Sequence, residues 1–141
     1  MRSMRLTDIT AFLSGGVVLG FGLFLIGLAV LVAARPSLAE RFLSSFASSA
    51  QAHYSEQLGR LTVGAAMTHF AHFMWFPYVF KLFGWVLVIS AIGLLVIPWQ
   101  WHHAFATKVM PPVIRHMRLF ALSASALGAF ILYGMSRAAG S

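Results

Sequence analysis

The sequence contains no cysteine, and this absence excludes disulfide bonds, thiolate metal sites and cysteine nucleophiles. Acidic residues are nearly as scarce, because Asp8, Glu40 and Glu56 are the only three. None of them lies inside one of the long apolar runs of the sequence, so a general acid and base built from two carboxylates has no candidates there. Other catalytic motifs are missing as well: no Gly-x-Ser-x-Gly turn accompanies the serines, and the glycines form no phosphate-binding loop.

Charged residues of either sign are few. Only 9% of the 141 residues are charged and 60% are hydrophobic, whereas soluble domains have roughly 25% charged residues. A soluble fold of this size could not cover its surface with so few charges, so lipid must replace water around most of it. We therefore predict an all-α polytopic membrane protein whose single domain covers residues 1–141.

The charges that are present are mostly positive, since ten Lys and Arg residues give a formal net charge of +7. They stand beside apolar runs and form no basic stripe with interleaved aromatic residues, which argues against nucleic acid as a partner. Membrane lipids are the expected partners, because anionic head groups attract cations that flank a span. The residues predicted to meet head groups are Arg35, Arg41, Arg60, Arg115 and Arg118.

Four runs with few or no charged residues are near the length of about 20 apolar residues that a membrane helix needs. The predicted spans are 10–34, 58–75, 78–98 and 113–135. The second span is the least apolar, and its polar or small residues are Thr62, Gly64, Thr68, His69 and His72. A three-span protein, with segment 58–75 lying in the membrane interface, is therefore the alternative.

The N-terminus has some features of a signal peptide, because Arg2 and Arg5 precede the first apolar run and Ser37-Leu38-Ala39 follows it. That run extends from Ala11 to Ala34, whereas the apolar region of a signal peptide has roughly 7–15 residues. We therefore expect the first span to remain in the protein.

Between Pro36 and Gly59, apolar residues recur every four positions, which indicates an amphipathic helix. Its apolar stripe consists of Leu38, Phe42, Phe46 and Ala50. Beside a membrane span, such a helix is expected to lie in the plane of the interface. Later in the chain, Pro77 stands among aromatic residues and predicts a tight turn between the second and third spans.

The two halves of the sequence share a pattern. Gly22 follows a phenylalanine and stands 14 residues before Pro36. Gly84 also follows a phenylalanine and stands 14 residues before Pro98. Each half then continues with a linker and an Arg-Leu pair that opens the next apolar run, so a tandem helical hairpin is one interpretation. Chance matching of two Leu-, Ala- and Gly-rich segments is the other. The repeats would cover residues 10–75 and 76–136.

The third and fourth spans contain a recognisable set of residues. They are Phe83-Gly84-Trp85-Val86-Leu87-Val88, Gly93-Leu94-Leu95, Pro98-Trp99-Gln100-Trp101-His102, Arg115, Arg118-Leu119, Gly128 and Leu132-Tyr133. In this pattern the second half of the chain resembles small uncharacterised bacterial inner-membrane proteins that share such a hairpin, and the first half resembles them loosely. The resemblance implies a bacterial inner membrane and supplies no functional residues.

Histidines are the only residues that suggest a cofactor. His69 and His72 are three positions apart and would share a face of the second span, so they are candidates for a metal site, a haem site or a polar pathway. We favour the competing interpretation, in which they contact head groups or a neighbouring helix, and we expect no metal and no other cofactor. The other histidines are interpreted as surface or interface residues: His53, His102, His103 and His116.

Small residues at helical spacing suggest close helix–helix contacts, either within the chain or with another subunit. They are Gly16 and Gly20 in the first span and Ala121, Ser125 and Ala129 in the fourth, with Ala124 and Gly128 beside that second row.

These observations favour a non-enzymatic accessory or assembly subunit of a complex in the bacterial inner membrane. Its partners would be other membrane subunits or further copies of the chain. A small homo-oligomeric transporter or channel is one alternative, with a polar stripe on the second span. A haem- or metal-binding membrane protein that uses His69 and His72 is another. Lys and Arg are more numerous beside the two long linkers, which favours a cytoplasmic location for these linkers.

Overall fold

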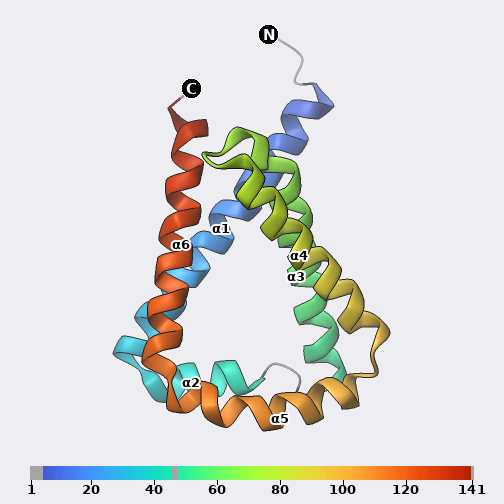
Figure 1. Ribbon diagram of the computed structural model, residues 1–141, viewed down its shortest axis with the longest axis vertical. Coiled ribbons are helices and arrows are strands. Elements are labelled where there is room, and N and C mark those ends of the chain that lie inside the picture. The colour runs from blue at the N-terminus through green and yellow to red at the C-terminus, as the bar shows by residue number, and fades with distance from the viewer. Residues whose placement is uncertain (1–4, 46–47, 141) are drawn as a thin grey trace.

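A computed structural model describes residues 5–45 and 48–140, and in this part the chain is helical almost throughout (Figure 1). The all-α prediction is therefore confirmed for the described residues. The elements are α1 (Leu6–Ala34), α2 (Pro36–Ser45), α3 (Ala50–Phe70), the 3₁₀ turn η1 (Ala71–Phe73), α4 (Pro77–Val96), α5 (Trp99–Arg115) and α6 (Met117–Ala139).

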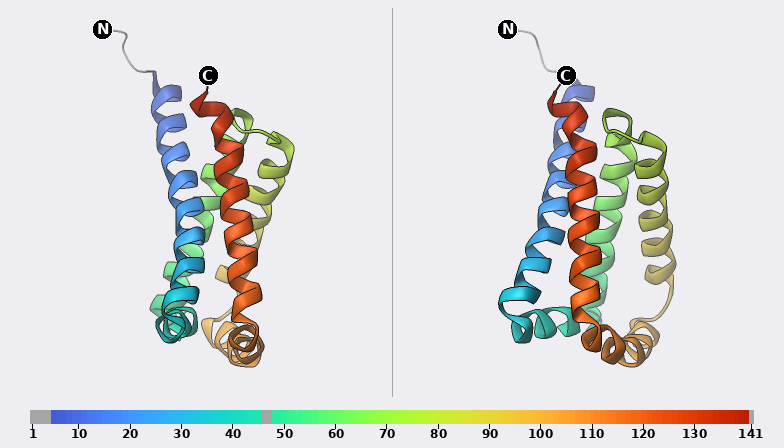
Figure 2. Two further views of the ribbon diagram at one scale, coloured as in Figure 1. Left: turned by 90° about the vertical axis from the view of Figure 1, so that its left-hand side faces the viewer. Right: turned by 60° about the vertical axis from the view of Figure 1, so that its left-hand side comes forward.

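Four long helices run between the two ends of the molecule, and two helices lie across one end. Figure 1 shows α1, α3, α4 and α6 close together at the end where the described chain begins and ends, and the pair α1–α6 apart from the pair α3–α4 toward the other end. Figure 2 shows the two short helices lying across that other end. There α2 and α5 lie roughly perpendicular to the long helices, and we call this end the cross-helix end. α1 and α4 both run toward it, and α3 and α6 both run away from it.

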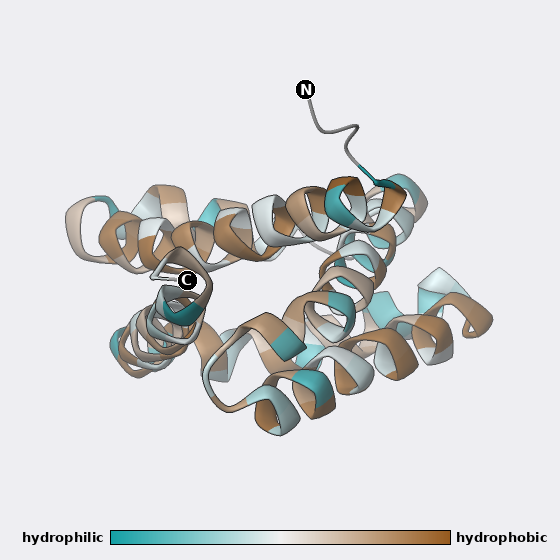
Figure 3. Ribbon diagram, turned by 90° about the horizontal axis from the view of Figure 1, so that it is seen from above, coloured by the Kyte–Doolittle hydropathy of each residue, from teal (hydrophilic) through white to brown (hydrophobic). Residues whose placement is uncertain are grey.

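Three of the described helices, α1, α4 and α6, are long and apolar enough to cross a membrane. In the most apolar window of α1, only 28% of the residues are buried by the rest of the chain. Figure 3 shows hydrophobic residues around most of α1, which is typical of a helix that lipid or other helices surround. α3 has 21 residues, so it is about 31 Å long at 1.5 Å per residue, but it is less apolar and does not belong to this set.

Two helix boundaries before the predicted second span differ from the expectation. α3 begins at Ala50, eight residues before the predicted start at 58, because the Ser49 hydroxyl accepts a hydrogen bond from the backbone N–H of Ala52 at 3.1 Å. The segment predicted as one amphipathic helix is accordingly divided, since α2 ends at Ser45. The buried residues of α2 are Ala39 and Leu43. Each comes directly after a residue of the predicted apolar stripe, Leu38 or Phe42, so the face of α2 that packs against the chain is adjacent to that stripe. Phe46 of that stripe lies outside the described residues.

The fourth predicted span also begins later than expected, at Met117 instead of 113, because α5 continues through Pro111 and Pro112 to Arg115. Each proline lacks a backbone N–H donor. In an α-helix, these N–H groups would bond the carbonyl oxygens four residues earlier in the chain. Both prolines are exposed, so the carbonyl oxygens that are left without this partner lie on an exposed side of α5. The bend between α5 and α6 falls at His116, whose Nδ1 hydrogen-bonds the carbonyl of Pro112 at 3.0 Å.

The main hydrophobic core lies toward the end where the termini are. It joins α1, the C-terminal part of α3, η1, α4 and α6, and its buried residues are Val18, Met67, Phe70, Ala71, Met74, Phe80 and Ile131. The turn predicted at Pro77 is present there: Phe76 has a left-handed backbone with φ of 57°, and Pro77 is the first residue of α4. The backbone N–H of Trp75 donates to the carbonyl of Gly134 at 2.9 Å, which ties this turn to α6.

Glycines bring the long helices together in two close pairs. A methyl group built on Gly128 of α6 would lie 2.8 Å from the carbonyl oxygen of Gly22 in α1. A methyl group on Gly64 of α3 would lie 2.8 Å from the carbonyl oxygen of Gly84 in α4. The pairs α1–α6 and α3–α4 therefore pack backbone to backbone. Each sequence half contributes one helix to each pair, and the predicted duplication stays a prediction.

Candidate functional site

The two histidines singled out by the sequence lie at the end of the molecule where the termini are. His69 is in the last turn of α3 and His72 is in η1, and both are exposed. Their ring centroids are 6.1 Å apart and the ring planes are nearly perpendicular. Among the described residues, no group of three or more His, Cys, Asp or Glu side chains could hold a metal ion. A cofactor at His69 and His72 therefore stays an untested alternative.

A different histidine pair is buried at the other end of the molecule. His53, in the first turn of α3, is fully buried, and its Nδ1 lies 2.7 Å from Nδ1 of His102 in α5. Its Nε2 lies 3.1 Å from the carbonyl oxygen of Leu94 in α4. His53 therefore connects three helices, two of which are separated from it by more than 40 residues of sequence.

The hydrogen-bond partners determine where the protons of this pair lie. A carbonyl oxygen can only accept, so Nε2 of His53 must carry the hydrogen that it donates to Leu94. In a neutral His53 ring, Nδ1 is then an acceptor, and His102 must donate to it from its own Nδ1. Desolvation by burial lowers the pKa of His102. The Glu56 carboxylate opposes this shift, while His53 and Arg60 add to it.

An ion pair lies one turn further along α3. Nη2 of Arg60 is 2.7 Å from Oε1 of Glu56, and the side chains of Arg60 and Glu56 are 31% and 18% exposed. The other carboxylate oxygen, Oε2, is buried without a hydrogen-bond partner among the described residues. The same is true of both amide atoms of Gln57, which is fully buried. The first half of α3 therefore has a row of polar side chains on the side that faces the rest of the chain: His53, Glu56, Gln57 and Arg60.

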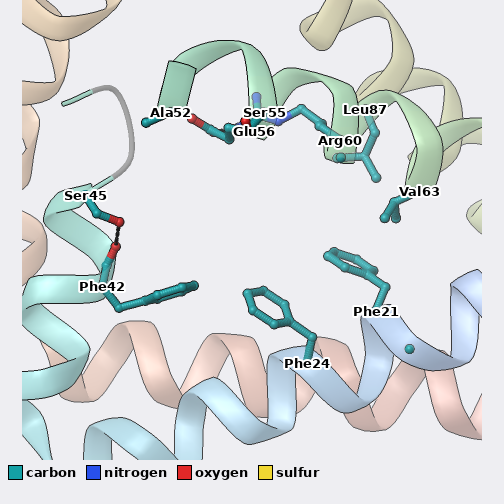
Figure 4. Close-up of a pocket in the computed structure, with 12 residues that line it drawn as sticks. Phe21, Phe24, Phe42, Ser45, Ala52, Ser55, Glu56, Arg60, Val63 and Leu87 are labelled. Atoms are coloured by element: carbon teal, nitrogen blue, oxygen red, sulfur yellow. Dashed lines mark hydrogen bonds and ion pairs between the residues drawn. The ribbon is translucent and has the colours of Figure 1, made fainter. Parts of the chain in front are cut away.

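This polar row borders an open cavity of about 730 Å³ between α1 and α3. Figure 4 shows its two sides: rings of phenylalanine from α1 and α2 face the side chains of α3. The aromatic side consists of Phe21, Phe24 and Phe42, and the rings of Phe24 and Phe42 meet edge to face at 6.1 Å. The opposite side is formed by Ala52, Ser55, Glu56, Gly59, Arg60 and Val63, with Gly20, Ser45 and Leu87 completing the lining.

A second, smaller cavity of about 240 Å³ adjoins the first, because Glu56 lines both. It lies between α3 and the cross-helix end, and His102 is the other titratable residue in its lining. Its remaining lining is apolar: Leu43, Phe105, Ala106, Val109, Met110, Val113 and Phe120. Glu56 thus stands where the two cavities meet.

The sequence reasoning missed this polar site. The sequence predicts His53 and His102 as surface or interface residues, and it gives Glu56 only as an acid outside the predicted spans. One signal was available: His53, Glu56, Gln57 and Arg60 recur at spacings of three and four, which places them on one side of a helix. The contact with His102 depends on the tertiary structure and had no sequence signal.

The small residues predicted to pack divide into two groups. Gly16 and Gly20 are exposed, and a methyl group built on either would have nothing within 4 Å. In α6, Ala121 and Ser125 are half-buried and Ala129 is exposed, while the adjacent Ala124 and Gly128 are buried. The closest contact with α1 is made by Gly128 of the neighbouring row, and Ala121 packs against a small cluster that includes Val32 of α1. Whether Gly16 and Gly20 contact another chain remains a prediction.

Four of the five arginines predicted to meet lipid head groups are exposed at or near the cross-helix end. They are Arg35, Arg41, Arg115 and Arg118. Arg60 differs from them, because it lies in the middle of α3 beside the cavity and pairs with Glu56. Its surroundings are those of a residue inside the helix bundle.

Comparison with models of protein families, with characterised proteins and with solved structures finds no match to this chain. The resemblance to bacterial inner-membrane proteins therefore remains a prediction, and the function has to be argued from the geometry.

Proposed function

We propose that the chain is a non-enzymatic, four-span protein of the bacterial inner membrane that serves as an accessory or assembly subunit, docking through an exposed glycine face of α1. The fourth span is α3. Support for it comes from chain direction, because α1 and α4 run the same way and the chain must return between them. Its polar residues His53, Glu56 and Gln57 lie against the rest of the chain, as polar groups in membrane helices do.

The observation that carries the docking proposal is a contrast between glycines. At six glycines, the close approach of another helix accounts for the lack of a side chain, because a methyl group would come within about 3 Å of that helix. They are Gly15, Gly22, Gly64, Gly84, Gly128 and Gly134. Gly16, Gly20 and Gly27 of α1 have open space instead. Their spacings of four and seven residues put all three on one face of the helix.

A glycine within a helix costs up to about 1 kcal/mol relative to alanine. Lipid chains do not need glycine to pack against a helix, whereas another helix can approach closely only where side chains are small. We therefore assign this face of α1 to a helix from another chain, either a different subunit or a second copy.

Affinity purification from native membranes in mild detergent, followed by mass spectrometry and light scattering, tests this assignment. Wild type should retain a stoichiometric partner or a second copy. Gly16→Leu and Gly27→Leu should lose it while eluting as folded protein, and Ala126→Leu, on an exposed side of α6, should retain it. A wild-type chain that purifies as a monomer would refute the docking proposal.

The transporter alternative gains less support than the docking proposal. The hydroxyls of Thr62 and Thr68, suggested for a transport pathway, bond to the carbonyls of Leu58 and Gly64 on their own helix. Neither residue lines the large cavity.

A further inference from the structure

The cavity between α1 and α3 has two chemically different sides, and this difference limits what could occupy it. Three phenylalanine rings line one side, and a polar side with Ser55, Glu56 and Arg60 faces them (Figure 4). Cavities of roughly 300–1,000 Å³ that are mostly apolar with a few converging polar groups are typical of small-molecule sites. The volume of about 730 Å³ lies in this range. The occupant therefore needs a long apolar part and a polar part at one side.

The ion pair determines the charge of the polar part. Glu56 neutralises Arg60 at a distance of 2.7 Å, so an ionic head group of either sign would meet one like charge in the pair. A guanidinium has five N–H groups, and one of those of Arg60 binds Glu56. Arg60 is also more exposed than Glu56. The side chain is thus placed to donate to an uncharged acceptor oxygen in the cavity.

We propose that this cavity binds a lipid-soluble molecule with an uncharged, hydrogen-bond-accepting head group, such as an ester or carbonyl, that Arg60 recognises. The apolar chain of the molecule lies along Phe21, Phe24 and Phe42. This site adjoins the glycine face of α1, because Gly20 also lines the cavity. The phenylalanines and the ion pair are not part of that face, so the proposal does not depend on which protein, if any, docks there.

The test uses three photoactivatable probes with the same alkyl chain and different head groups: a monoacylglycerol, an alkyl sulfonate and an alkyl trimethylammonium. Each is added to the full chain in lipid nanodiscs, and the labelled peptides are identified by mass spectrometry. The monoacylglycerol should label the peptides that contain residues 21–24 and 55–63 at least threefold more than either charged probe. Equal labelling by all three probes, or labelling confined to other surfaces, would overturn the proposal.

A cavity-filling variant separates binding in the cavity from general partitioning into lipid. Gly59 lines the cavity and a methyl group there meets nothing within 4 Å, so Gly59→Leu should fold normally while occupying the space. It should abolish labelling at both peptides. Gly93 has the same open surroundings but does not line the cavity, so Gly93→Leu should label as the wild type does. Unchanged labelling in Gly59→Leu would contradict the site.

Charge variants test the assignment of the head group independently of cavity filling. Glu56→Gln leaves Arg60 without its carboxylate, so the preference should shift toward the sulfonate. Arg60→Gln leaves Glu56 alone, so the preference should shift toward the trimethylammonium. If the order of preference among the three probes is the same in both variants and in the wild type, the ion pair does not determine which head group binds.

Discussion

His53 uses both ring nitrogens inside the molecule and has no exposed surface. Its replacement would leave the carbonyl of Leu94 and Nδ1 of His102 without this partner. An unsatisfied buried polar group costs about 1–3 kcal/mol, and His53 itself has no contact with solvent. His53 is therefore the histidine on which the position of α5 relative to α3 and α4 depends most directly.

We predict that His53→Ala lowers the free energy of unfolding by about 1–3 kcal/mol, because it leaves these groups unpaired. The midpoint of thermal unfolding in mild detergent measures the effect. His72→Ala, at an exposed histidine that makes no hydrogen bond within the described part of the chain, serves as the matched control and should leave the midpoint almost unchanged. Equal loss in both variants would argue against the buried pair.

The lowered pKa of His102 makes stability depend on pH. Its folded pKa lies below the ordinary value of 6.5, so the unfolded chain binds more protons when the pH falls below that value. The contribution of His102 is therefore complete above pH 6.5 and is lost progressively as the pH falls toward the folded pKa. Acidification should weaken the attachment of α5.

Thermal unfolding between pH 7.5 and pH 5 should reveal this dependence as a falling midpoint. His102→Asn keeps an N–H donor that can reach His53 but does not titrate, so its curve should fall less steeply than that of the wild type. His72→Asn, at the opposite end, should follow the wild type. Parallel curves for all three proteins would rule out His102 as the titrating group.

At the scale of helices, contacts between glycine backbones hold the pairs together. A methyl group on Gly84 would lie 2.8 Å from two backbone atoms of α3, the carbonyl oxygen of Gly64 and the amide nitrogen of Thr68. Backbone atoms cannot move aside as a flexible side chain can. α3, the most polar of the long helices, is therefore attached to α4 by a surface that tolerates no added volume.

Gly84→Ala should therefore destabilise the chain by about 1–3 kcal/mol, the usual cost of overpacking. Gly93→Ala, nine residues along the same helix in open space, removes a flexible residue and should be neutral or stabilising by up to about 1 kcal/mol. Thermal unfolding of the two variants under one condition compares them directly. A Gly84→Ala protein as stable as wild type would show that α3 and α4 are not in close contact.

For the whole molecule, the proposed topology puts the cross-helix end on one side of the membrane and both described chain ends on the other. The absence of cysteine makes single-cysteine labelling free of background. With four spans, Ser44→Cys in α2 and Lys108→Cys in α5 should react with an impermeant maleimide from the cytoplasmic side. Tyr78→Cys, at an 86% exposed position beside the Pro77 turn, should react from the opposite side.

The same experiment distinguishes the three-span alternative. If α3 lay in the interface, residues 44 and 78 would be on the same side of the membrane, because no spanning helix would separate them. Labelling of Ser44→Cys and Tyr78→Cys from one side would therefore refute the fourth span. The cytoplasmic side is expected for the cross-helix end, since most exposed cations lie there.

Much of the architecture follows from local pattern. Charge-free apolar runs predicted α1, α4 and α6 to within a few residues, because a membrane span requires a long run of apolar residues whatever it packs against. Pro77 predicted the turn, since proline lacks an N–H donor and restricts its neighbours. Two features were not predicted: the end of α2 at Ser45 and the continuation of α5 through Pro111 and Pro112. The first depends on the start of α3, which Ser49 caps, and the second on the exposed position of both prolines.

The sequence by itself therefore determined that the chain lacks cysteine and that its described part is helical almost throughout, with three apolar helices of membrane length. These properties depend on composition and on spacing along the chain. The tertiary structure alone decided which polar residues are buried together. His53 and His102 are 49 residues apart, and the cavity joins residues of α1, α2, α3 and α4. Such contacts arise only when the two helix pairs close at one end and diverge at the other, a geometry that the spacing of residues does not encode.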